Sequence, residues 1–485
     1  MAKRTAVIDI GSNSARLVIF QHTSRYGFHL LCQHKSRVRI GEGAYRQNGR
    51  LQPKPMRRAH ETLRSFKQIL DAYHVKQTVC VATSALRDAP NRSEFLEKVH
   101  KDLHLDIRVI DGTEEAHYGA LAAVNLLPVR DAVSIDIGGG SADLALIRNG
   151  TILETYSLNL GTVRLKELFT HDRVHLKRAK AYIERELARL PETFVSATAI
   201  GIGGSARALA KGVMTQTNYP FDKLHAFAYR YDEQRHYLDA IITAKMGDLD
   251  RLAIASDRHD TIREGTLILT AILDRICAQA VLTSGVGVRE GVFLQTMLRK
   301  DHGRYPDAIN PSIQSIRDRI DLLEFPTGHK AKMATELFEN YREIFGGNEE
   351  DQTMLLHALS LSNIGKMLTI YKEHQHAFYV AKHELNFGFT HAQMLLIAMI
   401  LRSKGKKYHK ALYQKYAMLL PKKKKIKWLI FIYSLVLILE EHAPESIITF
   451  ECKKNVLHVH GDFARYLMRE EIKKLPVPGK ISVQV

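Results

Sequence analysis

Cysteine is scarce in this 485-residue chain. Its four cysteines lie far apart, at Cys32, Cys80, Cys277 and Cys452. None are spaced as Cys-x-x-Cys, which rules out a structural zinc site built on such pairs and disfavours a disulfide framework. A reducing compartment fits this usage. Because the N-terminus also lacks a signal-peptide pattern, we expect a cytoplasmic protein.

Long hydrophobic runs are also lacking. The strongest candidate for a membrane span is the segment 428–439, WLIFIYSLVLIL, which follows the basic run Lys422 to Lys427. As a helix, twelve residues extend roughly 18 Å, well short of the ~30 Å hydrocarbon core of a bilayer. The sequence therefore predicts a buried helix and no membrane partner, with the basic run as a solvated loop between helices.

Acidic residues are outnumbered, since 52 Asp and Glu face 70 Lys and Arg and leave a formal net charge of +18. This surplus favours a polyanionic partner, such as nucleic acid, acidic lipid or a long phosphate chain. Aromatic residues make up 8% and are not interleaved with Lys or Arg, so a base-stacking platform for nucleic acid has little support. A hydrophobic share of 45% with 25% charged residues excludes disorder and coiled coil.

The P-loop pattern of nucleotide-binding proteins is absent, but another glycine pattern occurs twice. Residues 6–14 read AVIDIGSNS and residues 133–141 read VSIDIGGGS. Each is an apolar strand that ends in Asp and Gly and is followed by a second apolar strand, and the two copies are offset by 136 − 9 = 127 residues. Such a matched pair indicates two related lobes that face each other across one cleft.

The rest of the chain divides by its periodicity. Short strands alternate with helices up to about residue 305, which is typical of α/β lobes, and strand–glycine–helix turns recur at 198–209 and 280–293. Helical periodicity follows at 331–345, 354–371, 391–401 and 428–441, with a short strand-like tail from 447. We therefore expect two α/β lobes, 1–125 and 126–305, and a mostly helical domain, 306–485.

Both turns are rich in Gly and Ser, so their backbone N–H groups can point at an anion without a Cβ in the way. The donors would come from Ser12 to Ser14 and from Gly139 to Ser141, although tight hairpins need glycine in any case. Asp9 and Asp136 end the strands before the turns, and Asp143 lies on the strand after the second turn. These carboxylates suit Mg²⁺, with Asp9 in a supporting role, or they accept hydrogen bonds from their own turns.

Two further candidates lie near the turns. Glu114 and Glu115 open a helix, either as partners of its dipole or as a base that deprotonates water. Arg87 suits a phosphate, or forms a surface ion pair with Asp88. The 24 histidines show no zinc spacing; His374 and His376 are separated by one residue.

These residues together resemble the Ppx/GppA family of exopolyphosphatases and guanosine pentaphosphate phosphohydrolases. Seven motifs occur in the order typical of that family over about the first 300 residues: AVIDIGSNSARLVIF, VCVATSALRDA, VIDGTEEAHYG, SIDIGGGSADLALI, LNLGTVRLKE, AIGIGGSARAL and LTSGVGVREGVF. The resemblance implies an α/β fold of duplicated ribonuclease-H-like lobes, as in actin, sugar kinases and Hsp70, followed by a mostly helical HD-like C-terminal domain.

The resemblance also implies roles for single residues. Glu115 would be the catalytic base, and Asp136 and Asp143 would lie on the magnesium side. The implied phosphate-binding residues are Ser12, Asn13, Ser14, Arg87, Gly139, Gly140, Ser141, Gly204, Ser205 and Arg258. The implied cofactor is Mg²⁺, with Mn²⁺ as its substitute and room for a monovalent cation such as K⁺. The implied substrates are inorganic polyphosphate, guanosine pentaphosphate (pppGpp), or both, and the implied assembly is a homodimer.

The chain departs from the pattern of that family in two places. Asp143 stands where Glu is usual, so its shorter side chain would reach the metal through water. Ser362 and Asn363 stand where the HD-type domain carries a His-Asp dyad, so that metal site is expected to be lost. We read the helical domain as a channel wall and dimer surface. Two other functions stay open, a binder of (p)ppGpp or polyphosphate without catalysis, and a kinase on the same fold.

Overall fold

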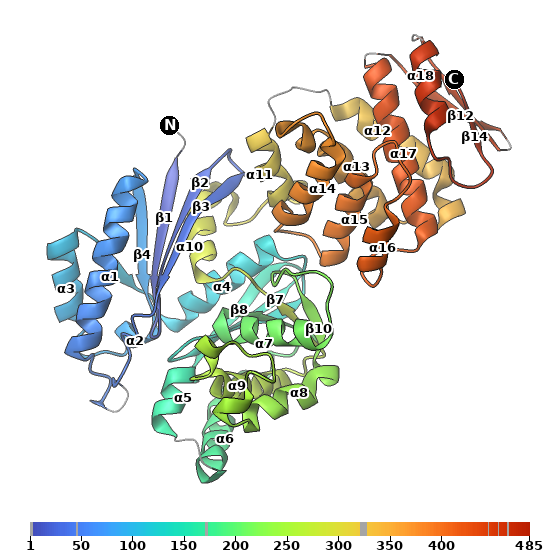
Figure 1. Ribbon diagram of the computed structural model, residues 1–485. Coiled ribbons are helices and arrows are strands. Elements are labelled where there is room, and N and C mark those ends of the chain that lie inside the picture. The colour runs from blue at the N-terminus through green and yellow to red at the C-terminus, as the bar shows by residue number, and fades with distance from the viewer. Residues whose placement is uncertain are drawn as a thin grey trace. The chain divides into compact units, whose positions relative to one another are not determined.

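The computed structural model describes residues 3–44, 47–169, 173–320, 327–444, 446–453, 455–462 and 465–485 (Figure 1). The chain divides into two compact units, Met1–Pro311 and Ser312–Val485. Each unit is described by itself.

The first unit opens with a five-stranded sheet in the order β3-β2-β1-β4-β5. β1 (Arg4–Ile10), β2 (Ala15–His22) and β3 (Phe28–Ser36) are antiparallel neighbours, while β4 (Gln77–Ala82) and β5 (Ile107–Val109) continue the sheet in parallel with β1. Alternate residues of β1 enter a core shared with α1 (Pro53–Ala72) and α3 (Arg92–Leu103). The residues between them, including Asp9, therefore point to the opposite face.

A second sheet repeats this plan. β6 (Ala132–Ile137), β7 (Ala142–Arg148) and β8 (Thr151–Leu158) form the meander, β9 (Thr198–Ile202) and β11 (Ala280–Thr283) run parallel to β6, and β10 (Ala228–Arg230) is added at the edge. Asp136 is paired with Asp143, as Asp9 is paired with Arg16 in the first sheet. The duplicated ribonuclease-H-like α/β fold expected from the sequence is thereby confirmed.

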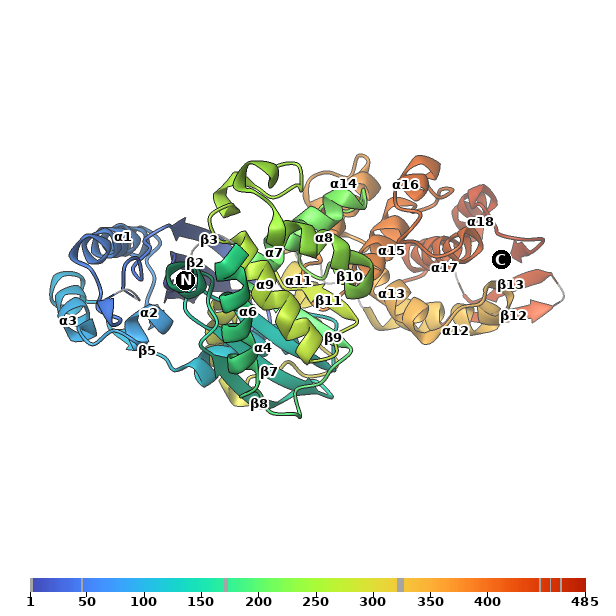
Figure 2. The same ribbon diagram turned by 90° about the horizontal axis from the view of Figure 1, so that it is seen from below.

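Helices cover both faces of the second sheet. On one face lies a core that includes residues of α6 (Arg173–Leu187), α7 (Gly203–Gln216) and α9 (Ile262–Arg275), with α8 (Tyr231–Thr243) alongside (Figure 2). α4 (Gly112–Leu126) packs on the other face, against β6, β7 and β8. The short helices α2 (Ser84–Arg87) and α5 (Thr162–Leu168) follow β4 and β8.

Helix α10 (Val288–Met297) follows the last strand of the second sheet but packs back onto the first one. The ring of Phe293 stacks on that of Phe20 with centroids 4.1 Å apart. α10 also crosses α4 at close range, since a Cβ on Gly291 would lie 1.9 Å from the carbonyl oxygen of Tyr118. α4 and α10 thus lie side by side between the two sheets (Figure 1).

The second unit is mostly helical, as expected. Its helices are α11 (Pro311–Ile320), α12 (Thr327–Phe345), α13 (Glu349–Ser360), α14 (Glu373–Glu384), α15 (His391–Arg402), α16 (Lys410–Lys415), α17 (Lys423–His442) and α18 (Arg465–Lys474). A small sheet of β12 (Thr449–Lys453), β13 (Val456–His460) and β14 (Ser482–Gln484) completes it. Trp428 on α17 stacks with Phe345 on α12, with ring centroids 5.8 Å apart.

Two predictions about this unit are wrong. Segment 354–371 is not one helix, because α13 ends at Ser360 and the chain turns through a short 3-10 helix, Ile364–Met367, so close to α14 that a Cβ on Gly365 would lie 1.9 Å from the Glu373 carbonyl oxygen. The basic run is not a loop, because α17 begins at Lys423. Ile426 is fully buried, which extends the apolar face of α17 back through the lysines.

Within the described ranges, no helix is both long enough and apolar enough to span a membrane.

Candidate active site

The two glycine turns are built alike. In the first, the Gly11 N–H donates to the Ser14 carbonyl oxygen at 3.1 Å, and in the second the Gly138 N–H donates to the Ser141 carbonyl oxygen at 2.9 Å. The turns also approach each other, since a Cβ on Gly139 would lie 2.8 Å from the Cβ of Ser12. Only glycine fits at position 139. Because it has no side chain, the two turns can approach each other closely.

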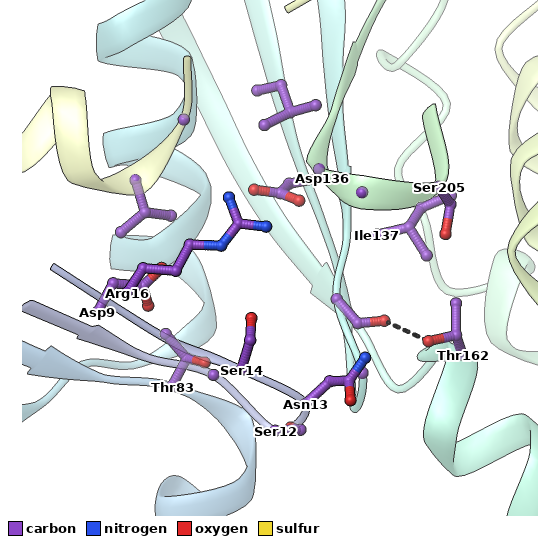
Figure 3. Close-up of a pocket in the computed structure, with 18 of the residues that line it drawn as sticks. Asp9, Ser12, Asn13, Ser14, Arg16, Thr83, Asp136, Ile137, Thr162 and Ser205 are labelled. Carbon is purple, nitrogen blue, oxygen red and sulfur yellow. Dashed lines mark hydrogen bonds between the residues drawn. The ribbon is translucent and has the colours of Figure 1, made fainter. Parts of the chain in front are cut away.

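A cavity of about 140 Å³ lies between these turns (Figure 3). Its lining comes from both sheets and from the helices that follow them. Of the residues expected from the sequence, it is lined by Asp9, Ser12, Asn13, Ser14, Glu115, Asp136, Gly139, Gly204, Ser205 and Arg258. The duplicated lobes thus bring residues up to 280 positions apart (289 − 9), from Asp9 to Arg289, to one site.

Several helices begin at this cavity. The N-terminal residues Gly203 to Ser205 of α7, Thr261 before α9, and Gly287 to Arg289 at the start of α10 all line it. The first N–H groups of a helix lack intrahelical partners, and its dipole is positive at that end. Three such ends around one cavity favour an anion with several oxygen atoms.

Gly203 is required by the way α7 begins. Its φ is +88°, and a Cβ at this position would lie 2.6 Å from Oδ1 of Asp136. Any other residue would therefore be strained and would push the Asp136 carboxylate out of place. Arg258 lies over the next residue, with its Nη1 only 2.5 Å from where a Cβ on Gly204 would be.

Glu115 reaches the cavity from the first turn of α4, which the Asp111 side chain caps by accepting from the Glu114 N–H at 2.8 Å. Its Oε2 lies 3.3 Å from Nη1 of Arg87. Burial and the nearby Asp143 raise the pKa of Glu115 well above its usual value, and Arg87 opposes this shift. Glu115 is therefore buried, lines the cavity and has a raised pKa. These properties suit a carboxylate that accepts a proton.

Glu114 points elsewhere. Its Oε1 accepts from the Tyr118 hydroxyl at 3.1 Å and pairs with Arg108. The adjacent carboxylates thus have different surroundings, and only Glu115 lines the cavity.

Asp136 and Asp143 lie opposite each other on β6 and β7. Burial raises the pKa of Asp136 to about 6 and that of Asp143 to about 7. Asp136 lines the cavity, but Asp143 lies behind it and accepts hydrogen bonds from Ser157 Oγ at 2.5 Å and Ser141 Oγ at 2.9 Å. Asp143 is therefore held by its own hairpin, and the structure does not place it at the cavity wall.

Three other expected residues are also outside the lining. Arg87 ends the one-turn helix α2, where it contacts Glu115 and lies 3.8 Å from Asp88. Arg87 thus pairs both with Asp88, as the sequence allowed, and with Glu115, which lines the cavity. Gly140 and Ser141 belong to the second turn but do not line the cavity, and the Gly140 carbonyl oxygen accepts from Arg164 Nε at 2.8 Å.

The sequence reasoning missed four cations that line the cavity, Arg16, Lys35, Arg207 and Arg289. Arg16 could have been found from the internal repeat, because it occupies the position equivalent to Asp143 (16 + 127 = 143). Arg207 and Arg289 stand inside two of the seven motifs. Lys35 is in β3, a strand that lies outside all of those motifs.

The carboxylates at the cavity suit a divalent cation only if the substrate shares in holding it. In the described part of the chain, no three Asp, Glu, His or Cys side chains are grouped to enclose a metal ion. Magnesium, however, is usually held by one or two carboxylates together with water and substrate phosphates. Asp136, with Glu115 nearby, fits that kind of shared site and does not fit an all-protein cage.

The residues at the HD-like position of the second unit are poor metal ligands. Ser362 is buried and Asn363 precedes the short 3-10 helix. Burial, together with the positive charges of Lys406 and Arg402, lowers the pKa of His374 to about 4. A metal ion bound by this imidazole would be repelled by the two basic side chains, so His374 is a poor metal ligand.

Comparison with known proteins gives consistent matches. Residues 18–300 match the model of the Ppx/GppA phosphatase family, and residues 327–463 match that of Ppx/GppA phosphatase domain III. The guanosine-5'-triphosphate,3'-diphosphate pyrophosphatase of Vibrio vulnificus is 28% identical over 411 residues, which are 82% of this chain and 80% of that protein. Its counterpart from Photobacterium profundum is 26% identical over 407 residues, 82% of this chain and 79% of that protein.

Solved structures agree. A Ppx/GppA family member from Aquifex aeolicus matches with a TM-score of 0.52 and 27% identity, over 62% of this chain and all (100%) of that one. An exopolyphosphatase from Cytophaga hutchinsonii matches with a TM-score of 0.57 and 26% identity, over 61% of this chain and 98% of that one.

Proposed function

This chain belongs to the Ppx/GppA phosphatase family and is a hydrolase, and we propose that it releases the terminal phosphate from inorganic polyphosphate, from guanosine pentaphosphate, or from both. The observation that carries the proposal is the pairing of two facing glycine turns with Glu115 in one cavity. The turns suit a phosphate, and Glu115 suits a water molecule beside it.

In this proposal Glu115 accepts a proton from water, and the water oxygen attacks the terminal phosphorus. The bond from that phosphorus to the bridging oxygen breaks, and the remaining chain leaves with the bridging oxygen and its negative charge. Orthophosphate is the other product. Arg87, 3.3 Å from Glu115, orients the carboxylate toward the water.

The terminal phosphate is held between the turns Ser12 to Ser14 and Gly138 to Gly139, with the start of α7 and Arg258 on one side. These donors are backbone N–H groups, hydroxyls and a guanidinium, the groups that bind phosphate oxygens best. Gly140, Ser141 and Asp143 support the second turn from behind.

We propose Asp136 as the protein ligand for Mg²⁺ or Mn²⁺ and Asp143 as a ligand through water. When bound, the ion neutralises negative charge on the phosphate oxygens. A monovalent cation such as K⁺ stays a prediction, as does the homodimer, which rests on the family resemblance alone. All four cysteines are free thiols, which supports a cytoplasmic location.

Different observations favour the two substrates. A net charge of +18 suits a long polyanion, because many weak contacts add up along it. The two guanosine pyrophosphatases of Vibrio vulnificus and Photobacterium profundum support pppGpp instead, so we propose both substrates.

The proposal is tested by offering polyphosphate and pppGpp separately to the purified chain with Mg²⁺ and following orthophosphate release. Release from at least one supports the proposal. Tight binding without release would indicate a non-catalytic binder, and phosphate transfer to a co-substrate would indicate a kinase.

A further inference from the structure

Helix α10 is the counterpart of α4 in the duplicated fold. α4 follows β5, the last strand of the first sheet, and α10 follows β11, which is parallel to β9 as β5 is to β4. Both helices begin at the cavity. α4 brings an acidic residue there, Glu115, whereas α10 brings a basic one, Arg289, to which the proposed reaction assigns no role.

The guanidinium of Arg289 is buried but poorly paired. Its side chain is 9% exposed, and its nearest carboxylate oxygen, Oε1 of Glu290, is 3.8 Å away, beyond hydrogen-bond range. Oε2 of Glu290 is used elsewhere, since it accepts from the Gly287 N–H at 2.8 Å. Within the described residues no acceptor takes a hydrogen bond from this guanidinium, although a buried arginine has five N–H donors to satisfy.

The backbone beside Arg289 adds more donors. α10 has 10 residues, and in the described structure the N–H groups of Val288 and Arg289 at its start have no acceptor. Both residues line the cavity. A helix start with free N–H groups, next to an unpaired buried guanidinium, fits an anionic oxygen.

Two further guanidinium groups lie close to Arg289. Burial is the main reason that the pKa of Arg16 is lowered, and the charge of Arg289 is the second. Burial, together with the charges of Arg16 and Arg289, lowers the pKa of Arg207 to about 10. The three arginines repel one another across the cavity. The carboxylates of Asp9, Asp136 and Glu290 lie near them and offset part of this repulsion. A bound anion would relieve that repulsion.

The position of Arg289 separates it from the terminal phosphate. Arg87 lies 3.3 Å from Glu115. The start of α10 lies beside Asp136 instead, since a Cβ on Gly287 would be 3.8 Å from Oδ2 of Asp136. Two phosphates that are bonded to each other would suit these two places.

We propose that Arg289 and the first N–H groups of α10 form a second phosphate subsite, which holds the phosphate next to the one that is removed. This inference rests on the proposed function and makes it more specific: the enzyme recognises two consecutive phosphates. The same chemistry would also accept free orthophosphate, so the test has to separate the two sources.

The test uses the full chain with Glu115→Gln, so that ligands are bound and not hydrolysed, and titration calorimetry with Mg²⁺ present. Orthophosphate, pyrophosphate and tripolyphosphate are the ligands. Adding Arg289→Gln is expected to raise the Kd for pyrophosphate and for tripolyphosphate about tenfold or more, the usual effect of losing charge-assisted hydrogen bonds. Orthophosphate, which occupies the turns, is expected to change by less than about twofold.

Arg50→Gln serves as the matched control, because it removes one positive charge from an exposed arginine outside the cavity. It is expected to leave all three affinities unchanged. Arg289→Lys keeps the charge but loses the planar fork, so it is expected to recover only part of the affinity for pyrophosphate.

If Arg289→Gln lowers the affinity for all three ligands equally, or for none of them, the proposed subsite is wrong. A loss of affinity for orthophosphate alone would also overturn it and would point to a site for the free ion. If Arg289→Gln does not fold, as shown by its thermal melt, full affinity in Arg289→Lys refutes the proposal, and a partial loss supports it. If the Glu115→Gln chain binds no tripolyphosphate at all, the proposed function fails, whatever Arg289 does.

Discussion

Replacing Glu115 by Gln removes the carboxylate that we assign as the base and little else. Glutamine has nearly the same size, and its amide oxygen can still accept from Arg87, 3.3 Å away in the parent chain. What is lost is the capacity to take a proton from water. General-base catalysis contributes about 10²- to 10⁴-fold, so we expect kcat to fall at least ~10²-fold.

Binding is expected to persist in this variant. Glu115 brings a negative charge close to an anionic substrate, so its removal leaves affinity unchanged or slightly improved. Orthophosphate release from tripolyphosphate at saturating concentration gives kcat, and calorimetry with the same ligand gives Kd.

The adjacent carboxylate provides the control. Glu114 is paired with Arg108 and Tyr118 outside the cavity, so Glu114→Gln is expected to change kcat by less than about threefold. Normal turnover in Glu115→Gln would refute the assignment. Loss of turnover in Glu114→Gln alone would mean that the two roles have to be exchanged.

Three further predictions follow from the geometry and charge of the site. Gly139→Ala is expected to lower kcat/KM for tripolyphosphate strongly, because the new Cβ would lie 2.8 Å from the Cβ of Ser12 and separate the two turns; unchanged kinetics would contradict this contact. Without divalent cations, the free energy of unfolding in urea is expected to fall from about pH 4 to pH 7 and then level off. The raised pKa values of Asp136 (about 6) and Asp143 (about 7) mean that the folded state binds protons more tightly than the unfolded state in that range; Asp143→Asn should flatten the curve. In the Glu115→Gln chain, Kd should rise more steeply with KCl for long polyphosphate than for pppGpp, as more phosphates are neutralised, and equal slopes from about 50 to 300 mM would argue against a polyphosphate track.

The parts of the site that the sequence predicted are those with a local signature. Asp9 and Asp136 were found because an apolar strand, an acidic residue and a glycine turn occur twice in the same spacing, and the structure places both side chains at one cavity. Glu115 was found because two adjacent acidic residues open a helix and the family resemblance singles out the second, and in the structure Glu115 lines the cavity whereas Glu114 does not.

The parts that were missed depend on contacts between distant segments. Arg16 has a counterpart in the internal repeat, and Arg207 and Arg289 stand inside motifs, but no single stretch of sequence shows that the three side chains line one cavity. Asp143 was placed on the strand after the second turn, and the structure pairs it there with Asp136, but Asp143 accepts hydrogen bonds from Ser141 and Ser157 and does not line the cavity.

In the helical unit, local patterns misled at two places. The lysines before Trp428 suggested a solvated loop, yet the buried Ile426 among them continues the apolar face of α17. Segment 354–371 kept its apolar periodicity past Ser360, but α13 ends at that residue, and the chain beyond it packs so closely on α14 that a Cβ on Gly365 would lie 1.9 Å from the Glu373 carbonyl oxygen. In both cases tertiary packing decided what periodicity alone left open.

The central claim is that water attacks the terminal phosphorus in this cavity. It is tested most directly by a single turnover of tripolyphosphate, with the enzyme in excess, in water enriched in ¹⁸O and with Mg²⁺ present. We expect one ¹⁸O atom in the released orthophosphate and none in the pyrophosphate, because the bridging oxygen leaves with the remaining chain. Label in the pyrophosphate, or no release of orthophosphate, would contradict the account.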